Sequence, residues 1–325
     1  MRKIILLCLL SILMFSCNKL QETTIVEENN NNQTGEIIDN DKEVIEEDDV
    51  NNAPAEIIYG PYEELAKPTD PRINEASGIA ASLYVSDAYW VHNDSGDKAN
   101  IFLCNPYTGE TINSGLVENA QNIDWEDMSS FRINGKSYLI IGATGDNARK
   151  RSQYQIYIME EPAPGAIGPF PYLNKIKFTY QGDESHNCES VAVDVTEGKI
   201  YLFTKTGDPD KSALYSLPLS IIQESETVQI ANFEAAPKVK SATGMDISPD
   251  GLRAIVITNK NNDCRAFQFT KLPDETWTEG FLRTPKVFDT PIRPTYEAIC
   301  YALDGETLVD KSEKGNFGKF TVMKD

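Results

Sequence analysis

The stretch NCESVAVDVTEGKIYLFTKTGD, residues 187–208, carries most of the information about the fold. It contains an apolar run, a short polar turn and a second apolar run, which is the pattern of two antiparallel strands joined by a tight turn. A polar pair, Asn187 and Glu189, begins the stretch, and Asp208 ends it. Because a hairpin returns the chain to where it began, we expect the pair and the acidic loop to be neighbours at one end of a small sheet.

The same arrangement occurs five times in the chain. The second polar positions are 49, 63, 54 and 54 residues apart, and in four repeats an acid follows 20, 20, 19 and 20 residues later. The five pairs are Glu75 and Ser77, Asp124 and Glu126, Asn187 and Glu189, Ser241 and Thr243, and Thr295 and Glu297. The acids are Asp97, Asp146, Asp208 and Asp263. Apolar segments after each hairpin predict a third strand and in most repeats a fourth.

Self-similar four-stranded units of about 40 to 50 residues are the sequence signature of β-propeller blades. We therefore predict an all-β fold, a β-propeller of four-stranded antiparallel blades. Five blades are favoured, and six are the alternative if a long stretch between two pairs hides a degenerate unit. The last repeat has residues for only three strands, so segment 57–62 is expected to supply the outer strand and close the ring.

The propeller is expected to span residues 57–325, preceded by two segments of another kind. Residues 1–16 contain Arg2, Lys3 and a short apolar stretch, which is typical of a secretory signal peptide. The end of this stretch, with Cys17 after a small residue, resembles the lipobox of bacterial lipoproteins. The resemblance implies that Cys17 carries acyl chains such as palmitate, and several chains anchor a protein stably to a membrane. An ordinary signal with an incidental cysteine is the alternative.

Residues 17–56 are expected to form an acidic, disordered tether. Positions 18–56 hold twelve Asp and Glu against two Lys, a composition that cannot bury enough apolar surface to fold. The acidic stretch also resembles the export signals of surface-displayed lipoproteins in Bacteroidota, and a mere spacer is the alternative. We thus predict an exported outer membrane lipoprotein, exposed at the cell surface if the acidic stretch is such a signal.

Charge and cysteine usage limit the partners. The formal net charge of −20 argues against nucleic acid, whose affinity comes from Lys and Arg, and is compatible with cations. Once Cys8 leaves with the signal and Cys17 is lipidated, the widely spaced Cys104, Cys188, Cys264 and Cys300 remain. No CxxC motif is present, so a thiolate metal site is not expected. Disulfides and buried free thiols are both compatible with an exported chain.

Residues i and i+2 of a strand point to one side, so the ten paired residues are predicted to form two polar rings at a channel mouth. Five are carboxylates and are candidate metal ligands: Glu75, Asp124, Glu126, Glu189 and Glu297. Crowded carboxylates need protons or a cation, and Ca²⁺ prefers such ligands. The alternative is that the three inner glutamates accept hydrogen bonds from backbone N–H groups of neighbouring blades and fix the ring.

Other residues expected near this mouth are candidates for ligand binding. They are Asp97, Asp146, Asp208, Arg149, Arg151, His92 and His186. Cationic side chains beside a metal would bind a phosphate or carboxylate, and a histidine could act as a general base. The alternatives are ordinary turn chemistry for the acids, surface ion pairs for the basic residues, and hydrogen-bonded structural histidines.

The repeats resemble the SdiA-regulated family of propellers, distant relatives of NHL-repeat proteins. The matching segments are EASGI at 75–79, WEDM at 125–128, CESVAVD at 188–194, ATGMDISPDG at 242–251 and YEAIC at 296–300. Where the family usually shows Glu-Gly, this chain has Glu-Asp at 126, Glu-Ser at 189 and Glu-Ala at 297. The resemblance implies a propeller architecture and no particular reaction.

The predicted function is that of a membrane-anchored lipoprotein whose propeller binds a small-molecule, glycan or protein ligand, with Ca²⁺ as the candidate cofactor. The sequence contains no Gly-x-Ser-x-Gly elbow, Walker-type loop or His-Glu-x-x-His motif, so catalytic residues are not assigned. The alternative is a metal-dependent propeller hydrolase acting on a phosphoester or lactone. A five-bladed glycosidase is a further alternative.

Overall fold

A computed structural model describes residues 54–221, 228–260, 263–293 and 295–323. The predicted signal peptide, Cys17 and residues 17–53 of the predicted tether lie outside the described residues. Within them the chain is built almost entirely of strands, with a three-residue 3-10 helix η1 (Pro209–Lys211) and a short helix α1 (Trp277–Gly280). None of the described helices has the length and hydropathy needed to cross a membrane.

Each polar pair and its hairpin open a four-stranded antiparallel unit. The first unit is β2 (Ala76–Ala81), β3 (Tyr89–Asn93), β4 (Asn100–Cys104) and β5 (Thr111–Leu116). The second is β6 (Asp127–Ile133), β7 (Lys136–Ala143), β8 (Tyr154–Glu160) and β9 (Asn174–Tyr180), and the third is β10 (Cys188–Asp194), β11 (Lys199–Thr204), β12 (Leu214–Pro218) and β13 (Gln229–Ala235). The fourth is β14 (Ala242–Ile247), β15 (Arg253–Lys260), β16 (Asp263–Thr270) and β17 (Lys286–Asp289). The last combines β18 (Tyr296–Tyr301), β19 (Leu308–Ser312) and β20 (Phe317–Phe320) with β1 (Glu63–Glu64).

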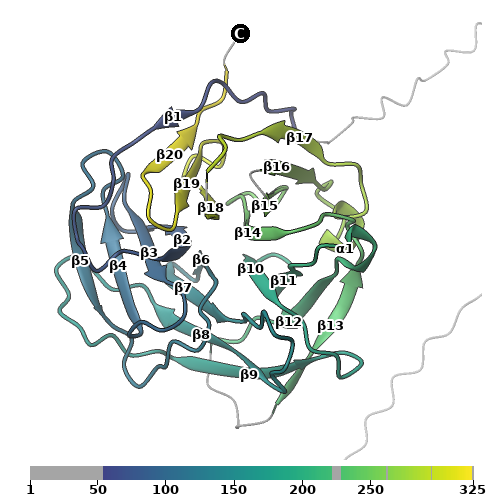
Figure 1. Cartoon of the computed structure of the whole chain (residues 1–325), viewed down its shortest axis with the longest axis horizontal. Helices are drawn as coiled ribbons and strands as arrows, with labels where there is room; N and C mark the ends of the chain where they lie inside the picture. Colours follow the sequence, from purple (N-terminus) through teal and green to yellow (C-terminus); the bar gives the residue numbers. More distant parts are fainter. Residues whose placement is uncertain (1–53, 222–227, 261–262, 294, 324–325) are drawn as a thin grey trace, which may run out of the picture. The chain divides into compact units, whose positions relative to one another are not determined.

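The units surround a common axis. In Figure 1 the first strand of each unit lies at the centre and the last at the rim. The central strands of the described residues contact one another in the cyclic order β2, β6, β10, β14, β18 and back to β2. Four-stranded antiparallel sheets set around an axis make a β-propeller, so the predicted all-β fold and the four-stranded units are confirmed.

The N-terminal segment pairs with the last unit, although not where the sequence analysis placed the strand. Strand β1 pairs antiparallel with Lys319 and Gly318, and Tyr59 makes a single bridge with Val322. The prediction that residues 57–62 form one continuous outer strand is therefore wrong. It contains Pro61, which has no N–H group to donate to a ladder, and regular pairing resumes only two residues later.

Turn chemistry explains why the repeats fold as hairpins. Between β6 and β7 the chain turns through two residues, Asn134 and Gly135, whose φ angles are 51° and 78°. Two positive φ angles define a type I′ turn, and the Asn-Gly pair adopts it readily. The central hairpins of the third, fourth and last units also have a glycine with positive φ in the turn, namely Gly198, Gly251 and Gly305.

One pairing between units was not predicted. The outer strands β9 and β13 pair in parallel, with Gln229 opposite Phe178 and Ala231 opposite Tyr180. The second and third units therefore form one continuous eight-stranded sheet. This pairing satisfies backbone groups that an outer strand otherwise exposes at a sheet edge.

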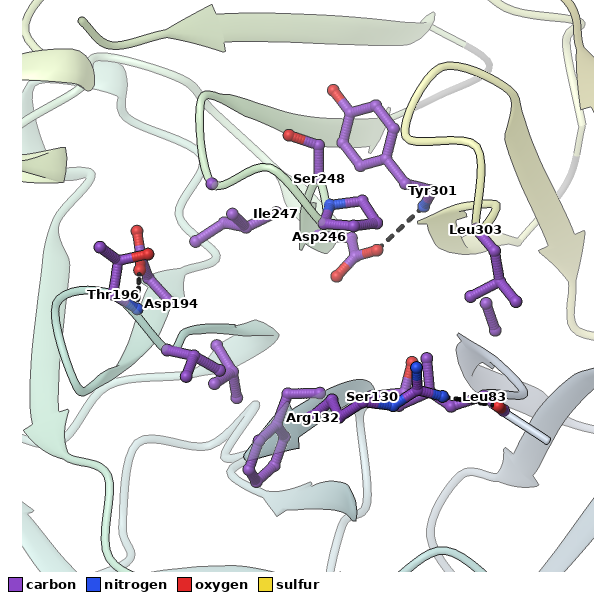
Figure 2. Close-up of a pocket in the computed structure, with 16 residues that line it drawn as sticks. Leu83, Ser130, Arg132, Asp194, Thr196, Asp246, Ile247, Ser248, Tyr301 and Leu303 are labelled. Carbon is purple, nitrogen blue, oxygen red and sulfur yellow. Dashed lines mark hydrogen bonds between the residues drawn. The ribbon is translucent and has the colours of Figure 1, made fainter. Parts of the chain in front are cut away.

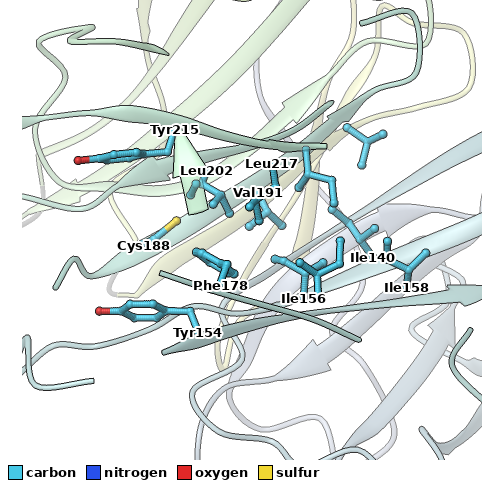
Figure 3. Close-up of a cluster of buried hydrophobic side chains, with 14 of the residues drawn as sticks. Ile140, Tyr154, Ile156, Ile158, Phe178, Cys188, Val191, Leu202, Tyr215 and Leu217 are labelled. Atoms are coloured by element: carbon cyan, nitrogen blue, oxygen red, sulfur yellow. The ribbon is translucent and has the colours of Figure 1, made fainter. Parts of the chain in front are cut away.

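The core lies between the faces of neighbouring units. Figure 3 shows Ile140, Ile156 and Phe178 of the second unit packed against Val191 and Leu202 of the third. Aliphatic and aromatic side chains of this size contribute about 1.5–3 kcal/mol each when fully buried. The four cysteines of the described residues are buried free thiols rather than disulfides: Cys104, Cys188, Cys264 and Cys300.

Candidate functional site

The central strands begin irregularly, and this changes the predicted rings. Asp124, Ser241 and Thr295, the first members of three pairs, have φ angles of 58°, 58° and 57°. In the first, third, fourth and last units, the pairing of the central strand with the next strand shifts register at or near the second residue of the polar pair. In the second unit this residue, Glu126, lies just before β6. An i, i+2 pair shares one side only in an extended strand. The ten residues therefore do not form two regular rings, although the side chains of two pairs, Asp124 with Glu126 and Asn187 with Glu189, do lie together.

Two of the ten paired residues join neighbouring units through their hydroxyl groups. The Ser77 hydroxyl donates to the backbone carbonyl of Glu126 at 2.6 Å, and the Thr243 hydroxyl donates to that of Tyr296 at 2.7 Å. Both side chains are buried, and each reaches the start of the next unit. A hydroxyl held by a carbonyl in this way stabilises the ring.

The remaining glutamates of the inner positions surround Lys205, the residue after β11. The Lys205 ammonium forms an ion pair with Glu189, whose carboxylate also accepts a hydrogen bond from the Asn187 side chain at 2.9 Å. Glu126 and Glu297 lie close enough to interact electrostatically with the same ammonium. The positive charge that crowded carboxylates require is thus supplied in part by a lysine of the chain itself.

The acid–base properties of this cluster are unusual. Burial raises the pKa of Glu126 well above its usual value, and the nearby carboxylates of Glu189 and Asp94 raise it further. Burial likewise raises the pKa of Glu297 to about 8 and raises that of Asp94. Although burial favours its neutral form, the pKa of Lys205 is raised because Glu189 and Glu297 stabilise the ammonium. The cluster therefore holds glutamates whose pKa values are raised beside a lysine whose charged form is stabilised.

Three carboxylates on one side of the cluster form a possible cation site. Asp94, Asp124 and Glu126 each offer an oxygen, and these atoms all lie within 4.8 Å of one another. Asp94 follows β3 and Asp124 precedes β6, so the first and second units both contribute. Below, the acidic mouth means these three residues together with Glu189, Glu297 and Lys205.

A glycine makes room for this arrangement. A Cβ atom added to Gly145 would lie 2.0 Å from a Glu126 carboxylate oxygen and 2.6 Å from Asp124 Cγ. Only a residue without a side chain therefore allows both carboxylates to approach each other here. The oxygen-only donor set and this cradle fit a hard cation such as Ca²⁺.

Glu75, also predicted as a metal ligand, is not one of these three residues. Its carboxylate is half-exposed and pairs with Lys314 at 3.5 Å. Of the predicted metal ligands, the structure brings Asp124 and Glu126 together and adds Asp94, which the sequence analysis missed. The signal was present, because Asp94 lies three residues before the Asp97 that was chosen instead.

The acidic loops are held mainly by their own backbones. Asp146 accepts hydrogen bonds from the N–H groups of Lys150 and Arg151 at 2.9 and 2.8 Å and from the Tyr154 hydroxyl at 2.9 Å. Asp208 caps the helix η1, and Asp97 accepts from the Asn93 side chain at 2.7 Å. These contacts are the turn chemistry that the sequence analysis gave as the alternative to ligand binding.

The predicted basic and histidine residues also have structural partners. Arg151 donates to the carbonyls of Gly145 and Ala143 at 2.6 and 3.0 Å, and Arg149 is an exposed turn residue with a φ angle of 50°. His92 is fully buried against Gly78, so the expectation that it reaches a ligand is wrong. His186 is half-buried and its Nε2 lies 3.0 Å from the Tyr215 hydroxyl.

Two other acids, and not the inner glutamates, accept hydrogen bonds from backbone N–H groups of other units. Asp127 accepts from the N–H groups of Val191 and Met245 at 2.9 and 3.1 Å. Asp246 accepts from the N–H of Tyr301 at 2.9 Å. Both carboxyl groups are buried, and burial raises the pKa of Asp246 to about 7. The alternative that Glu126, Glu189 and Glu297 fix the ring in this way is therefore wrong.

Comparisons with known proteins support the fold alone. No protein-family model and no curated protein sequence matches the chain. A similar solved structure is the major allergen Mala s 1 of Malassezia sympodialis, with 11% identity, a TM-score of 0.50, and coverage of 80% of this chain and 96% of that one. The PQQ-bound aldose sugar dehydrogenase of Streptomyces coelicolor has 11% identity, a TM-score of 0.43, and coverage of 83% and 100%. The Dos1 propeller has 11% identity, a TM-score of 0.38, and coverage of 76% and 68%.

The raised pKa of Glu297 predicts a specific pH dependence. Its folded pKa of about 8 lies above the ordinary 4.5, so its contribution to stability is complete below pH 4.5 and is lost as pH rises through 8. A glutamine cannot ionise, so between pH 5 and 9 Glu297→Gln should lose less stability than the parent, by up to about 4 kcal/mol. Urea unfolding at both pH values measures the difference.

The control variant is Glu306→Gln, which alters an exposed glutamate in the turn between β18 and β19. It should follow the parent at both pH values. If Glu297→Gln also follows the parent, Glu297 ionises in the folded protein as it does in water, and the description of the acidic mouth is wrong.

Proposed function

We propose that this chain is an exported, membrane-anchored lipoprotein whose propeller binds Ca²⁺ at the acidic mouth and uses the ion to hold an oxygen-rich ligand. The observation that carries the proposal is the convergence of Asp94, Asp124 and Glu126, whose oxygens lie within 4.8 Å of one another. These residues come from two different units, so the fold itself brings them together.

The charge balance of the mouth favours a bound cation. The mouth contains five carboxyl groups and one ammonium, and Lys205 is paired with Glu189 rather than with the three carboxylates of the set. Burial first, and the neighbouring carboxylates second, raise the pKa values of Asp94 and Glu126, so without a further cation these groups take up protons more readily. A divalent cation would replace these protons, because it lowers the pKa of the carboxylates that bind it.

The geometry leaves room for a ligand on the ion. Ca²⁺ takes six to eight oxygen atoms, and three monodentate carboxylates leave several positions for water or ligand oxygens. Glu297 stands beside this set with a pKa of about 8, so at neutral pH it can donate a hydrogen bond. A phosphate, carboxylate or sugar ligand has oxygen atoms that can bind the ion and accept a hydrogen bond from Glu297.

The proposal extends to the blade number and the anchor. We take the four-stranded units as five blades, with β1 supplying the outer strand of the last one and so tying both ends of the domain together. Support for this comes from the antiparallel pairing of Glu63 with Lys319. Anchoring through lipidated Cys17, with residues 17–56 as the tether, rests on the sequence signal described above.

A metal-dependent hydrolase of phosphoesters or lactones is the second candidate function. The observation in its favour is that Glu297, whose pKa is raised to about 8, neighbours the ion pair of Glu189 and Lys205. A carboxyl group kept protonated near neutral pH beside an ionised one is the arrangement that general acid catalysis uses.

Calcium titration of the purified protein tests the principal proposal. We expect saturable binding of one Ca²⁺, a higher melting temperature with the ion, and tighter binding at pH 8 than at pH 6, because protons and metal compete for the same carboxylates. Asp124→Asn and Glu126→Gln should each weaken binding by about tenfold or more. Gly145→Ala should do the same because its methyl group displaces both carboxylates.

Asp87→Asn is the matched control, since Asp87 is an exposed acid in the turn between β2 and β3, at the other end of β2. It should bind Ca²⁺ as the parent does. The proposal is contradicted if isothermal titration shows no saturable binding up to about 5 mM, a range that covers the weakest extracellular Ca²⁺ sites.

Anchoring is tested separately by fractionating cells that express the full chain. Cys17→Ala should move the protein from the membrane fraction to the soluble exported fraction, because no acyl chain can then be attached. Cys8→Ala changes the other cysteine of the N-terminal segment and should leave the distribution unchanged. Retention of the Cys17→Ala variant in membranes would rule out the lipobox.

A further inference from the structure

The opposite end of the channel holds a cavity that the sequence analysis did not anticipate. Its volume is about 460 Å³, within the range of roughly 300–1,000 Å³ that small-molecule sites occupy. It lies where the central strands end, and residues in or just beyond all five of these strands line it. The acidic mouth lies where the same strands begin, so the two sites are separated by the length of a strand.

The walls of the cavity combine apolar side chains with several polar ones. Phe131, Val193 and Ile247 are buried along its sides, while Val195 and Leu303 remain 41% and 46% exposed at its rim. Exposed apolar side chains gathered around an opening are typical of a binding site for an apolar group.

The polar groups of the cavity differ in their free hydrogen-bonding capacity. Asp194 already accepts from the Trp277 indole at 2.9 Å and pairs with Lys271 at 3.1 Å. Asp246 accepts from Tyr301 N–H at 2.9 Å and from the Ser129 hydroxyl at 3.2 Å. Both acids therefore already have donors.

Arg132 is different. Its guanidinium donates to the Leu83 carbonyl at 2.8 Å, and within the described ranges it has no acidic partner. Figure 2 shows Arg132 and Ser130 on one side of the opening and Asp246 and Ser248 on the other. Arg132 is thus a cation at the surface with unused donors, and a guanidinium binds a carboxylate in a bidentate manner.

We propose that this cavity binds a small amphipathic monocarboxylate, with its carboxylate on Arg132 and its apolar body between the walls. The position of Asp246 sets the orientation. Asp246 comes before the end of β14 and accepts hydrogen bonds from Ser129 and Tyr301 of two other central strands, so it lies further inside the cavity than the exposed Arg132. An anion placed deep would face this carboxyl group, whereas an anion at the rim meets Arg132. A terminal hydroxyl or an apolar end would therefore enter first.

Binding of 4-phenylbutyrate to the full chain, followed by isothermal titration, tests the proposal. The neutral 4-phenylbutanol has the same apolar body without the carboxylate. We expect saturable binding of the acid and at least about tenfold weaker binding of the alcohol. Arg132→Ala should weaken binding of the acid by a similar factor, and Leu303→Trp, which fills the rim, should also weaken it.

Arg265→Ala is the matched control, because Arg265 is an exposed arginine that pairs with Asp263 on the third strand of the fourth unit. This variant should bind 4-phenylbutyrate with unchanged affinity. Removal of Ca²⁺ with a chelator should also leave the affinity unchanged, which would show that the cavity binds independently of the acidic mouth. The proposal is overturned if 4-phenylbutyrate shows no saturable binding up to about 10 mM. A dissociation constant above this concentration corresponds to a binding free energy of less than about 3 kcal/mol. Equal affinity for acid and alcohol, or an unchanged affinity in Arg132→Ala, also overturns it.

Discussion

The carboxylate of Asp127 is the contact on which the centre of the molecule depends. It receives the N–H groups of Val191 and Met245, at 2.9 and 3.1 Å, and that of Met128 at 2.9 Å. The central strand of each unit has one edge without a neighbouring strand, and unpaired backbone groups in a buried place are costly. A single side chain of β6 thus satisfies edge groups of both β10 and β14. Asp246 has a similar role, since it accepts hydrogen bonds from the N–H group of Tyr301 in β18 and from the hydroxyl of Ser129 in β6.

These buried acids explain how the two ends of the channel arise. Burial raises the pKa of Asp127 well above its ordinary value despite three backbone donors. Its neighbour Glu126 precedes the strand and lies at the acidic mouth, while Asp246, near the end of β14, faces the cavity at the other end. The same central strands therefore present a carboxylate cluster with Lys205 at one end and an apolar cavity with Arg132 at the other.

The repeat made the fold predictable, because period-two apolar runs and turns such as Asn134-Gly135 depend on local sequence. The site was predictable only in part. The positive φ of Asp124 and the register shifts beside Ser77 and Thr243 are local backbone irregularities that an ideal strand does not anticipate. The roles of Lys205 and Asp127 depend on contacts between units distant in the chain. Strand β1 begins later than expected because Pro61 interrupts the ladder.

Amide hydrogen exchange at Val191 and Met245 tests most directly whether Asp127 holds the central strands together. We predict that both amides exchange only through global unfolding in the parent protein, since their acceptor is buried. In Asp127→Leu, which replaces the carboxylate by an apolar group of similar size, both should exchange much faster relative to Val256 on the neighbouring ladder strand β15. Fast exchange of Val191 and Met245 in the parent, or no relative change in Asp127→Leu, would contradict the central role of this carboxylate.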